Sequence, residues 1–166
     1  NNYVPSLTTL RGAQLRSEAA SALEDLFAEA EAAGLSTKIV SAYRSYSTQV
    51  STYNGYVNQY GEAQADTFSA RPGHSEHQTG LAVDVGNANG YCELEICFGT
   101  TPFGEWLKTN AKTFGFIIRY PEGKESQTGY QYEPWHLRYV GPETAQGIAS
   151  SGKTMDEYFG VSAGGY

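Results

Sequence analysis

Apolar residues recur every three or four positions over residues 13–33, a spacing that predicts an amphipathic helix with acidic residues on its outer face. The predicted inner face consists of Leu15, Ala19, Leu23, Leu26, Phe27 and Ala30. Gly34 is expected to end this helix, and residues 1–12 are expected to be irregular. A similar spacing over residues 47–60 predicts a second helix with Ser47 as its N-cap.

Three short segments rich in β-branched and aromatic residues predict strands, at residues 37–43, 81–85 and 116–120. Residues 130–140 are expected to be extended, because Pro134 and several aromatic residues disfavour a helix. Further helices are expected from Thr101-Pro102 to Gly115, and over residues 142–151 and 153–159. Connections are expected over residues 61–79 and 121–126. The chain contains no internal repeat or linker, so residues 1–166 are predicted to form a single α+β domain.

The composition excludes some functions. The net charge is −7 and no Lys/Arg cluster is present, which argues against a nucleic-acid partner. No apolar run approaches the roughly 18 residues that a membrane-spanning helix needs. The sequence starts at Asn1 with no signal peptide, so a mature or truncated form is expected, with any anchoring segment outside it. A monomer is expected, because no extended apolar face is left without a place in the fold.

The chain has two cysteines, Cys92 and Cys97. Two cysteines this close together are typical of a small disulfide loop formed in an oxidising compartment. Free thiols are the alternative. A zinc site on this pair is not expected, since no further Cys or nearby His completes four ligands.

The candidate chemistry is concentrated in residues 69–84, a Gly/Pro-interrupted loop that carries His74 and His77 and runs into a short apolar segment ending at Asp84. Imidazole and carboxylate are ligands that zinc accepts, and a catalytic zinc needs three of them with one position left for water. The remaining histidine of the chain is His136, which has Glu133 three residues before it. These residues predict a His/Asp/His zinc site with Glu133 as the base.

From residue types alone, that hypothesis and a domain without metal are about equally supported. Histidines are more often surface or hydrogen-bonded core residues than ligands, and His74 competes with His77 for the ligand role. Asp84 could instead cap the turn at Asn87. A glutamate three residues before a histidine has little specificity by itself.

The spacing nevertheless constrains the geometry. Because side chains on a strand alternate between faces, His77 and Asp84, seven residues apart, can meet only if His77 lies in the loop before the strand. Glu133 and His136 are three apart and are separated by Pro134, which favours an irregular entry into a strand. The arrangement therefore differs from the helical His-Glu-x-x-His zinc motif.

Two motifs resemble those of a known family. The run Ser75-Glu-His-Gln-Thr-Gly-Leu-Ala-Val-Asp84 resembles the Ser-x-His-x-x-Gly-x-Ala-x-Asp signature of zinc D-alanyl-D-alanine carboxypeptidases, and Glu133-Pro-Trp-His136 resembles their Glu-x-x-His signature. That family includes VanY-type and VanX-type enzymes and peptidoglycan L,D-carboxypeptidases. Residues 41–49, 71–80 and 115–121 look like the VanY branch. The resemblance covers nearly all of residues 8–160 and implies a small central antiparallel sheet with flanking helices, the VanX/VanY/Hedgehog-like fold.

The resemblance also implies roles for individual residues. His77 (rather than His74), Asp84 and His136 would bind Zn²⁺, Glu133 would act as general base, and Arg44 would stabilise the oxyanion. Recognition of a free C-terminal carboxylate calls for further hydrogen-bond donors. The candidates are Ser75, Gln49, Arg71 and Arg138. Each arginine could instead serve in a surface or structural ion pair.

The function that follows is that of a secreted, extracellular or cell-wall-associated bacterial zinc D,D-carboxypeptidase, which removes the terminal D-alanine from peptidoglycan stem peptides. One alternative is an L,D-carboxypeptidase acting on tetrapeptide stems. Another, of a different class, is a non-catalytic, zinc-stabilised peptidoglycan-binding module. The motifs specify the metal and the base, and they leave D,D-, L,D-, dipeptidase and endopeptidase specificity open.

Overall fold

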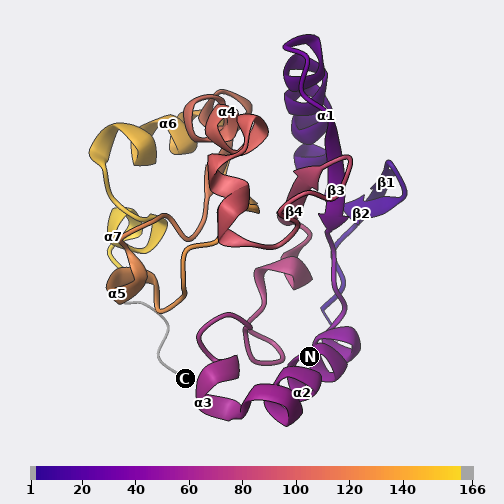
Figure 1. The fold of residues 1–166 in the computed structure, drawn as a ribbon, viewed down its shortest axis with the longest axis vertical. Helices are drawn as coiled ribbons and strands as arrows, with labels where there is room; N and C mark the ends of the chain where they lie inside the picture. The colour runs from indigo at the N-terminus through magenta and orange to yellow at the C-terminus, as the bar shows by residue number, and fades with distance from the viewer. Residues whose placement is uncertain (1–2, 162–166) are drawn as a thin grey trace.

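A four-stranded antiparallel sheet forms the centre of the computed structural model, which describes residues 3–161. The strand order is β3-β4-β6-β5, with bounds Thr37–Ser41, Ala82–Asn87, His136–Tyr139 and Phe116–Ile118. A separate two-stranded hairpin, β1 (Thr8–Leu10) and β2 (Ala13–Leu15), lies at the edge of the molecule (Figure 1). The predicted α+β class and antiparallel sheet are confirmed.

Strand alternation gives the sheet two different faces. Val83 and Val85 on β4 and Leu137 on β6 are fully buried in the main hydrophobic core. Helix α1 (Ser17–Ala32), helix α4 (Pro102–Asn110) and the 3₁₀ turn η3 (Ala111–Phe114) supply much of the rest of this core. The intervening residues Asp84 and His136 must therefore point to the opposite face of the sheet.

A second, smaller apolar cluster supports the other end of the sheet. Ile117 of β5 packs there with Ala145 and Ile148 of α6 (Pro142–Ser151). Short helices α5 (Glu125–Thr128) and α7 (Met155–Phe159) lie below α6 in Figure 1. The C-terminal helix α6 thus covers the β5 edge of the sheet.

Helices α2 (Tyr46–Tyr60) and α3 (Glu62–Ala65) form a lobe set apart from the sheet (Figure 1). Only Gln49 and Tyr53 of α2 are buried. The Tyr53 hydroxyl donates to Asp66 at 2.7 Å, and the Gln49 amide donates to the Ala70 carbonyl at 2.6 Å. These bonds hold the 61–70 connection against α2, together with the aromatic contacts of Tyr56 and Tyr60 with Phe68.

The predicted start of the first helix is wrong. Residues 13–15 form β2 and α1 begins at Ser17, while residues 8–10, expected to be irregular, form β1. The cause is the turn at Arg11 and Gly12, whose φ angles of 48° and 85° allow a tight two-residue hairpin. Residues 13–15 therefore pair with residues 8–10 as a strand, although the apolar spacing placed them at the start of the helix.

Other boundaries also differ from the predictions. Ser45, and not Ser47, caps α2, because its hydroxyl accepts the Thr48 amide at 3.1 Å. Short helices occupy residues 62–65 and 125–128, where only connections were expected. The last strand is confined to residues 136–139, and α7 starts at Met155.

Cys92 and Cys97 are joined by a disulfide in the segment between β4 and α4. The bond closes a short loop in which Leu94 adopts a φ of 54°. Among residues 3–161, no helix is both long and apolar enough to cross a membrane.

Two helical glycines provide a matched test of this packing. In Gly104→Ala the new Cβ would overlap the carbonyl oxygen of Phe98, so the free energy of unfolding should fall by about 1–3 kcal/mol. In Gly55→Ala the new Cβ meets nothing within 4 Å, and the free energy of unfolding should rise by about 0.5–1 kcal/mol. Urea denaturation of both variants measures the two changes, and a Gly104→Ala variant as stable as Gly55→Ala would contradict the packing around Phe98.

Candidate metal centre and active site

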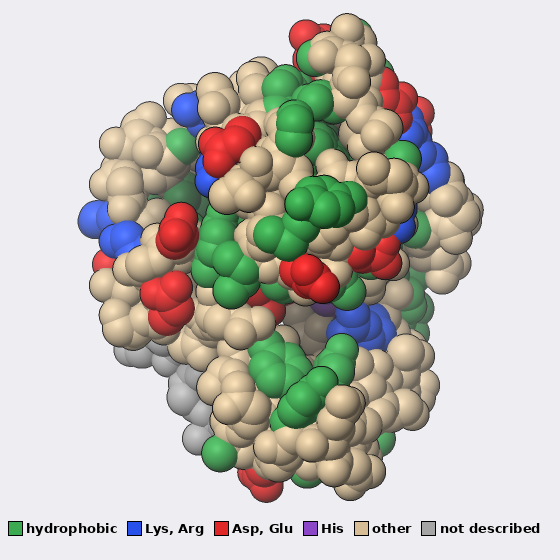
Figure 2. Space-filling view, viewed as in Figure 1, with side chains coloured by type: hydrophobic (Ala, Val, Ile, Leu, Met, Phe, Trp, Pro, Cys, Tyr) green, Lys and Arg blue, Asp and Glu red, His purple; other side chains and the backbone are tan. Residues whose placement is uncertain are grey.

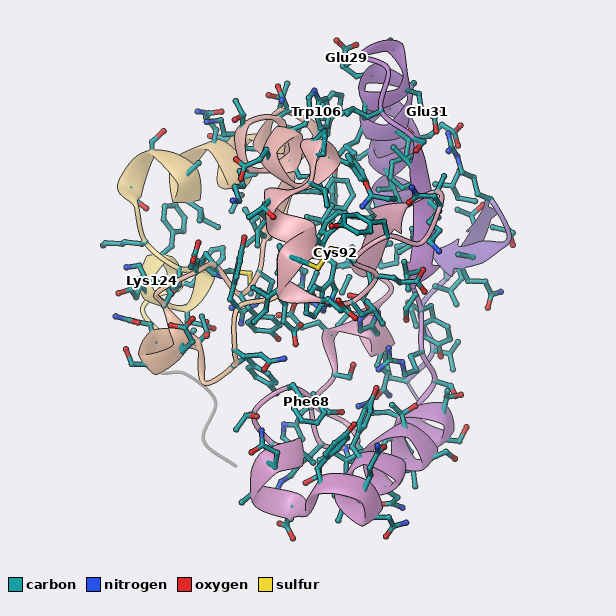
Figure 3. All side chains as sticks on the ribbon, in the orientation of Figure 1. Glu29, Glu31, Phe68, Cys92, Trp106 and Lys124 are labelled. Atoms are coloured by element: carbon teal, nitrogen blue, oxygen red, sulfur yellow. A yellow bond between two sulfur atoms is a disulfide. The ribbon has the colours of Figure 1, made fainter. Side chains whose placement is uncertain are left out.

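A cleft of about 180 Å³ separates the sheet from the α2–α3 lobe. Figure 2 shows it as a hollow with histidine at its floor, blue basic side-chain atoms at one edge and apolar side chains on either side. Phe68 lines it from the lobe and Leu94 from the disulfide loop. In Figure 3, Phe68 and Cys92 lie on opposite sides of this gap.

Three potential metal ligands meet at the floor of the cleft. Asp84 and His136 are direct register partners on the neighbouring strands β4 and β6. His77 reaches them from the 3₁₀ turn η1 (Glu76–Thr79), which precedes β4. All three are buried, and their ligand atoms lie within 4.8 Å of one another. His77 therefore lies in the loop before the strand, where the odd spacing required it.

The ring nitrogens have distinct surroundings. His77 Nδ1 lies 2.7 Å from the Ala42 carbonyl, and its Nε2 faces Asp84 Oδ2 at 3.3 Å. His136 turns its Nδ1 toward Asp84 Oδ1 at 3.1 Å. His77 Nε2, the Asp84 carboxylate and His136 Nδ1 therefore converge on one point.

The residues present fit a zinc ion. Asp84 Oδ1 is buried, and although His136 Nδ1 lies 3.1 Å away, no hydrogen bond of good geometry reaches this oxygen within residues 3–161, which is costly for a carboxylate unless a cation binds it. Burial raises the pKa of Asp84, but the His77 and His136 rings outweigh it and hold that pKa below its ordinary range. Two imidazoles and one carboxylate are three ligands of the kind that a catalytic zinc uses, and such a zinc would keep a further position for water.

Glu133 stands beside this group at the entry to β6. Its Oε2 lies 3.8 Å from His136 Nδ1, and a turn bond from the His136 amide to the Glu133 carbonyl, 3.1 Å long, brings both residues to the same side. Burial raises the pKa of Glu133 to about 7, with Asp84 adding to the rise while His136 and Arg44 oppose it. A carboxylate with such a pKa can both accept and return a proton near neutral pH.

Arg44 approaches the cleft from the residues after β3. Its two terminal nitrogens donate to Gln49 Oε1 at 2.9 Å and to Ser41 Oγ at 3.0 Å. Because the Gln49 amide nitrogen is bonded to Ala70, both ends of the Gln49 side chain are occupied by protein groups. Gln49 therefore orients Arg44 in this structure, while Ser75 is a buried residue of the cleft wall.

Comparison with known proteins agrees with this geometry. The family described as VanY, D-alanyl-D-alanine carboxypeptidase, matches residues 12–142. The chain belongs to this family. The resemblance inferred from the two motifs is therefore confirmed.

Individual VanY-family relatives and related structures cover most of the chain. The YodJ protein of Bacillus subtilis (strain 168) is 47% identical over 145 residues, which are 87% of this chain and 53% of YodJ. The LdcB LD-carboxypeptidase structure has a TM-score of 0.89 and 43% identity, and the match covers 96% of this chain and 79% of LdcB. A D,D-pentapeptidase VanY from a VanB-type resistance cassette, in complex with Zn(II), has a TM-score of 0.84 at 35% identity, with 95% and 91% of the two chains covered. The chain spans about half the length of several curated relatives that it matches.

Two of the arginines considered for substrate binding lie outside the cleft wall. Arg71 is paired with Asp66 and Glu62, each at 2.7 Å. Arg138, on β6, contacts Glu76 Oε1 at 3.2 Å behind the metal-ligand group. His74 is exposed and is not among the converging ligands. A second group of potential ligand atoms, on Cys92, Glu95 and Cys97, contains two sulfurs that are already bonded to each other.

Sequence reasoning gave no role to Glu76 or Arg119, which the structure places against the VanY-family site. Glu76 lines the cleft and Arg119 bonds to it at 2.8 Å. Glu76 occupies the x position of the Ser-x-His part of the signature, so the motif gave no reason to select it. Its place beside the cleft is seen only from the direction of its side chain in η1. For Arg119, the only sequence signal was the similarity of residues 115–121 to the VanY branch.

Proposed function

We propose that this chain is a zinc carboxypeptidase that removes the C-terminal D-alanine from peptidoglycan stem peptides at the bacterial cell surface. The observation that carries the proposal is the convergence of His77, Asp84 and His136 on the cleft floor, with Glu133 beside them. A non-catalytic binding module would need the ligands but would have no use for a buried carboxylate in Glu133's position. An extracellular site of action agrees with the Cys92–Cys97 disulfide.

His77, Asp84 and His136 would hold the metal. When bound, zinc lowers the pKa of a water molecule to near 7 and polarises the scissile carbonyl. Glu133 takes a proton from the attacking water and delivers it to the leaving amine, which a pKa of about 7 permits in both directions. The Arg44 guanidinium, held by Gln49 and Ser41, supplies positive charge to the carbonyl oxygen as that oxygen becomes negative.

We infer that the cleft receives a free peptide end. Apolar residues Leu94 and Phe68 border it from opposite sides, and the buried Ser75 and the half-buried Arg44 also line it. We infer that these two polar residues receive the terminal carboxylate. Arg71 and Arg138 are assigned no part in this contact, because their guanidinium groups pair with carboxylates elsewhere.

Two different peptide bonds are candidates for cleavage. A D,D-enzyme cleaves between the two D-alanines of a pentapeptide, as the name of the D,D-pentapeptidase VanY states for that protein. An L,D-enzyme cleaves the D-alanine that follows the L-diamino acid of a tetrapeptide. The second candidate is favoured by the LdcB LD-carboxypeptidase, since its TM-score of 0.89 and identity of 43% exceed those of the VanY structure.

Replacing the base tests the mechanism. In Glu133→Gln, zinc content and fold should be retained, whereas kcat for release of D-alanine should fall by about 10²–10⁴-fold, because the amide cannot accept the proton. The matched control is Glu122→Gln, the same change at an exposed turn residue, which should leave the rate unchanged. Turnover by Glu133→Gln at the wild-type rate would reject the assignment.

A defined substrate pair tests specificity. The zinc-loaded protein is incubated with a stem pentapeptide ending in D-Ala-D-Ala and a tetrapeptide ending in L-diamino acid-D-Ala, and the products are weighed by mass spectrometry. A D,D-enzyme shortens only the pentapeptide by one residue, and an L,D-enzyme shortens the tetrapeptide. The same peptides with a C-terminal amide should stay intact, because the carboxylate contact is lost. Cleavage of neither free-acid peptide would contradict the proposed reaction.

A further inference from the structure

The Glu76 carboxylate lies behind His136, on the side of the ring away from the converging ligands. His136 Nδ1 faces Asp84 Oδ1 at 3.1 Å, while its Nε2 faces Glu76 Oε2 at 3.7 Å. Glu76 immediately precedes the ligand His77 in the chain, so one turn of η1 supplies both a metal ligand and this carboxylate.

The two facing atoms can act as hydrogen-bond donor and acceptor to each other. Within residues 3–161, both His136 Nε2 and Glu76 Oε2 are buried without a hydrogen-bond partner. Leaving a buried polar atom without a hydrogen-bond partner is destabilising, and more so for a charged group. The two atoms are 3.7 Å apart, so an approach of about half an ångström would form a hydrogen bond and satisfy both groups together.

We propose that Glu76 is a positioning residue for the metal ligand His136. Its carboxylate accepts the Nε2–H of His136, which fixes the tautomer whose Nδ1 is free to bind zinc and increases the basicity of that nitrogen. The inference rests on the zinc site of the proposed function and is independent of the substrate.

Glu76 is itself held rigidly. Its other oxygen, Oε1, accepts from Arg119 Nε at 2.8 Å and lies 3.2 Å from Arg138 Nη1. Arg119 in turn makes a two-pronged contact with Asp156 of α7, at 2.7 and 2.9 Å. Such a fork holds a guanidinium in a single orientation. The contacts from Asp156 through Arg119 to Glu76 therefore connect α7 to the carboxylate that faces His136 and hold that carboxylate in place.

A purely structural role for Glu76 would be to neutralise Arg119 and Arg138. That role predicts that removing the carboxylate lowers stability and leaves zinc affinity unchanged. Positioning of His136 predicts a change in zinc affinity itself, measured on folded protein.

The experiment measures the zinc dissociation constant by competition with a chromogenic chelator, at fixed pH, for wild type, Glu76→Ala, Glu76→Gln and Asp156→Asn. Loss of an outer carboxylate that orients a metal-bound histidine typically costs 10–100-fold in affinity, and we expect a loss of about that size in Glu76→Ala. Glu76→Gln should lose less, because its amide oxygen still accepts the Nε2–H. Asp156→Asn, which weakens Arg119's outer contact but keeps the Glu76 carboxylate, should lose less affinity than Glu76→Ala.

A second readout keeps the proposal testable if Glu76→Ala does not fold. In ¹⁵N-labelled, zinc-loaded wild type, long-range ¹H–¹⁵N spectra should show His136 with Nε2 protonated and Nδ1 bound to metal. Zinc on Nε2, or wild-type affinity in a folded Glu76→Ala variant, would overturn the inference while leaving the proposed function intact. A wild-type protein that binds no zinc would overturn both.

Discussion

The pairing of β4 with β6 is the constraint on which the rest of the site depends. Their register sets Asp84 directly opposite His136, on the face of the sheet away from the hydrophobic core. A slip of one residue would turn either side chain into that core and bring Val83 or Leu137 into the cleft. Burial of the apolar neighbours Val83 and Leu137 stabilises the pairing of the two strands, and the same pairing holds Asp84 and His136 close together.

The third ligand and the base come from irregular segments tied to this pair. His77 is anchored through its Nδ1 to the Ala42 carbonyl, and the Arg44 amide bonds back to the His77 carbonyl at 3.2 Å. Glu133 is held by its backbone bond to Tyr120 at 3.0 Å. Irregular segments thus supply the third ligand and the base, while the sheet fixes the other two ligands, an arrangement in which a rigid scaffold presents functional loops. The α2–α3 lobe then closes the far side of the cleft.

Much of the site could be predicted from sequence because it is local. Two motifs contain the ligands and the base, and the odd spacing of His77 and Asp84 required His77 to precede the strand. Contacts that depend on side-chain direction could not be predicted. Gln49 turned out to hold Arg44, Arg138 lies behind the ligands, and Glu76 faces His136. The β1–β2 hairpin was missed because a left-handed turn at Arg11 and Gly12 outweighs the helical periodicity that begins at Ala13.

The most direct test of the account is X-ray diffraction from crystals of the zinc-loaded protein, with anomalous data collected on both sides of the zinc absorption edge. The account predicts a single zinc peak about 2.0–2.2 Å from His77 Nε2, an Asp84 carboxylate oxygen and His136 Nδ1, with Glu133 beside its open position. A peak at any other group of residues, or none at these three, would contradict it.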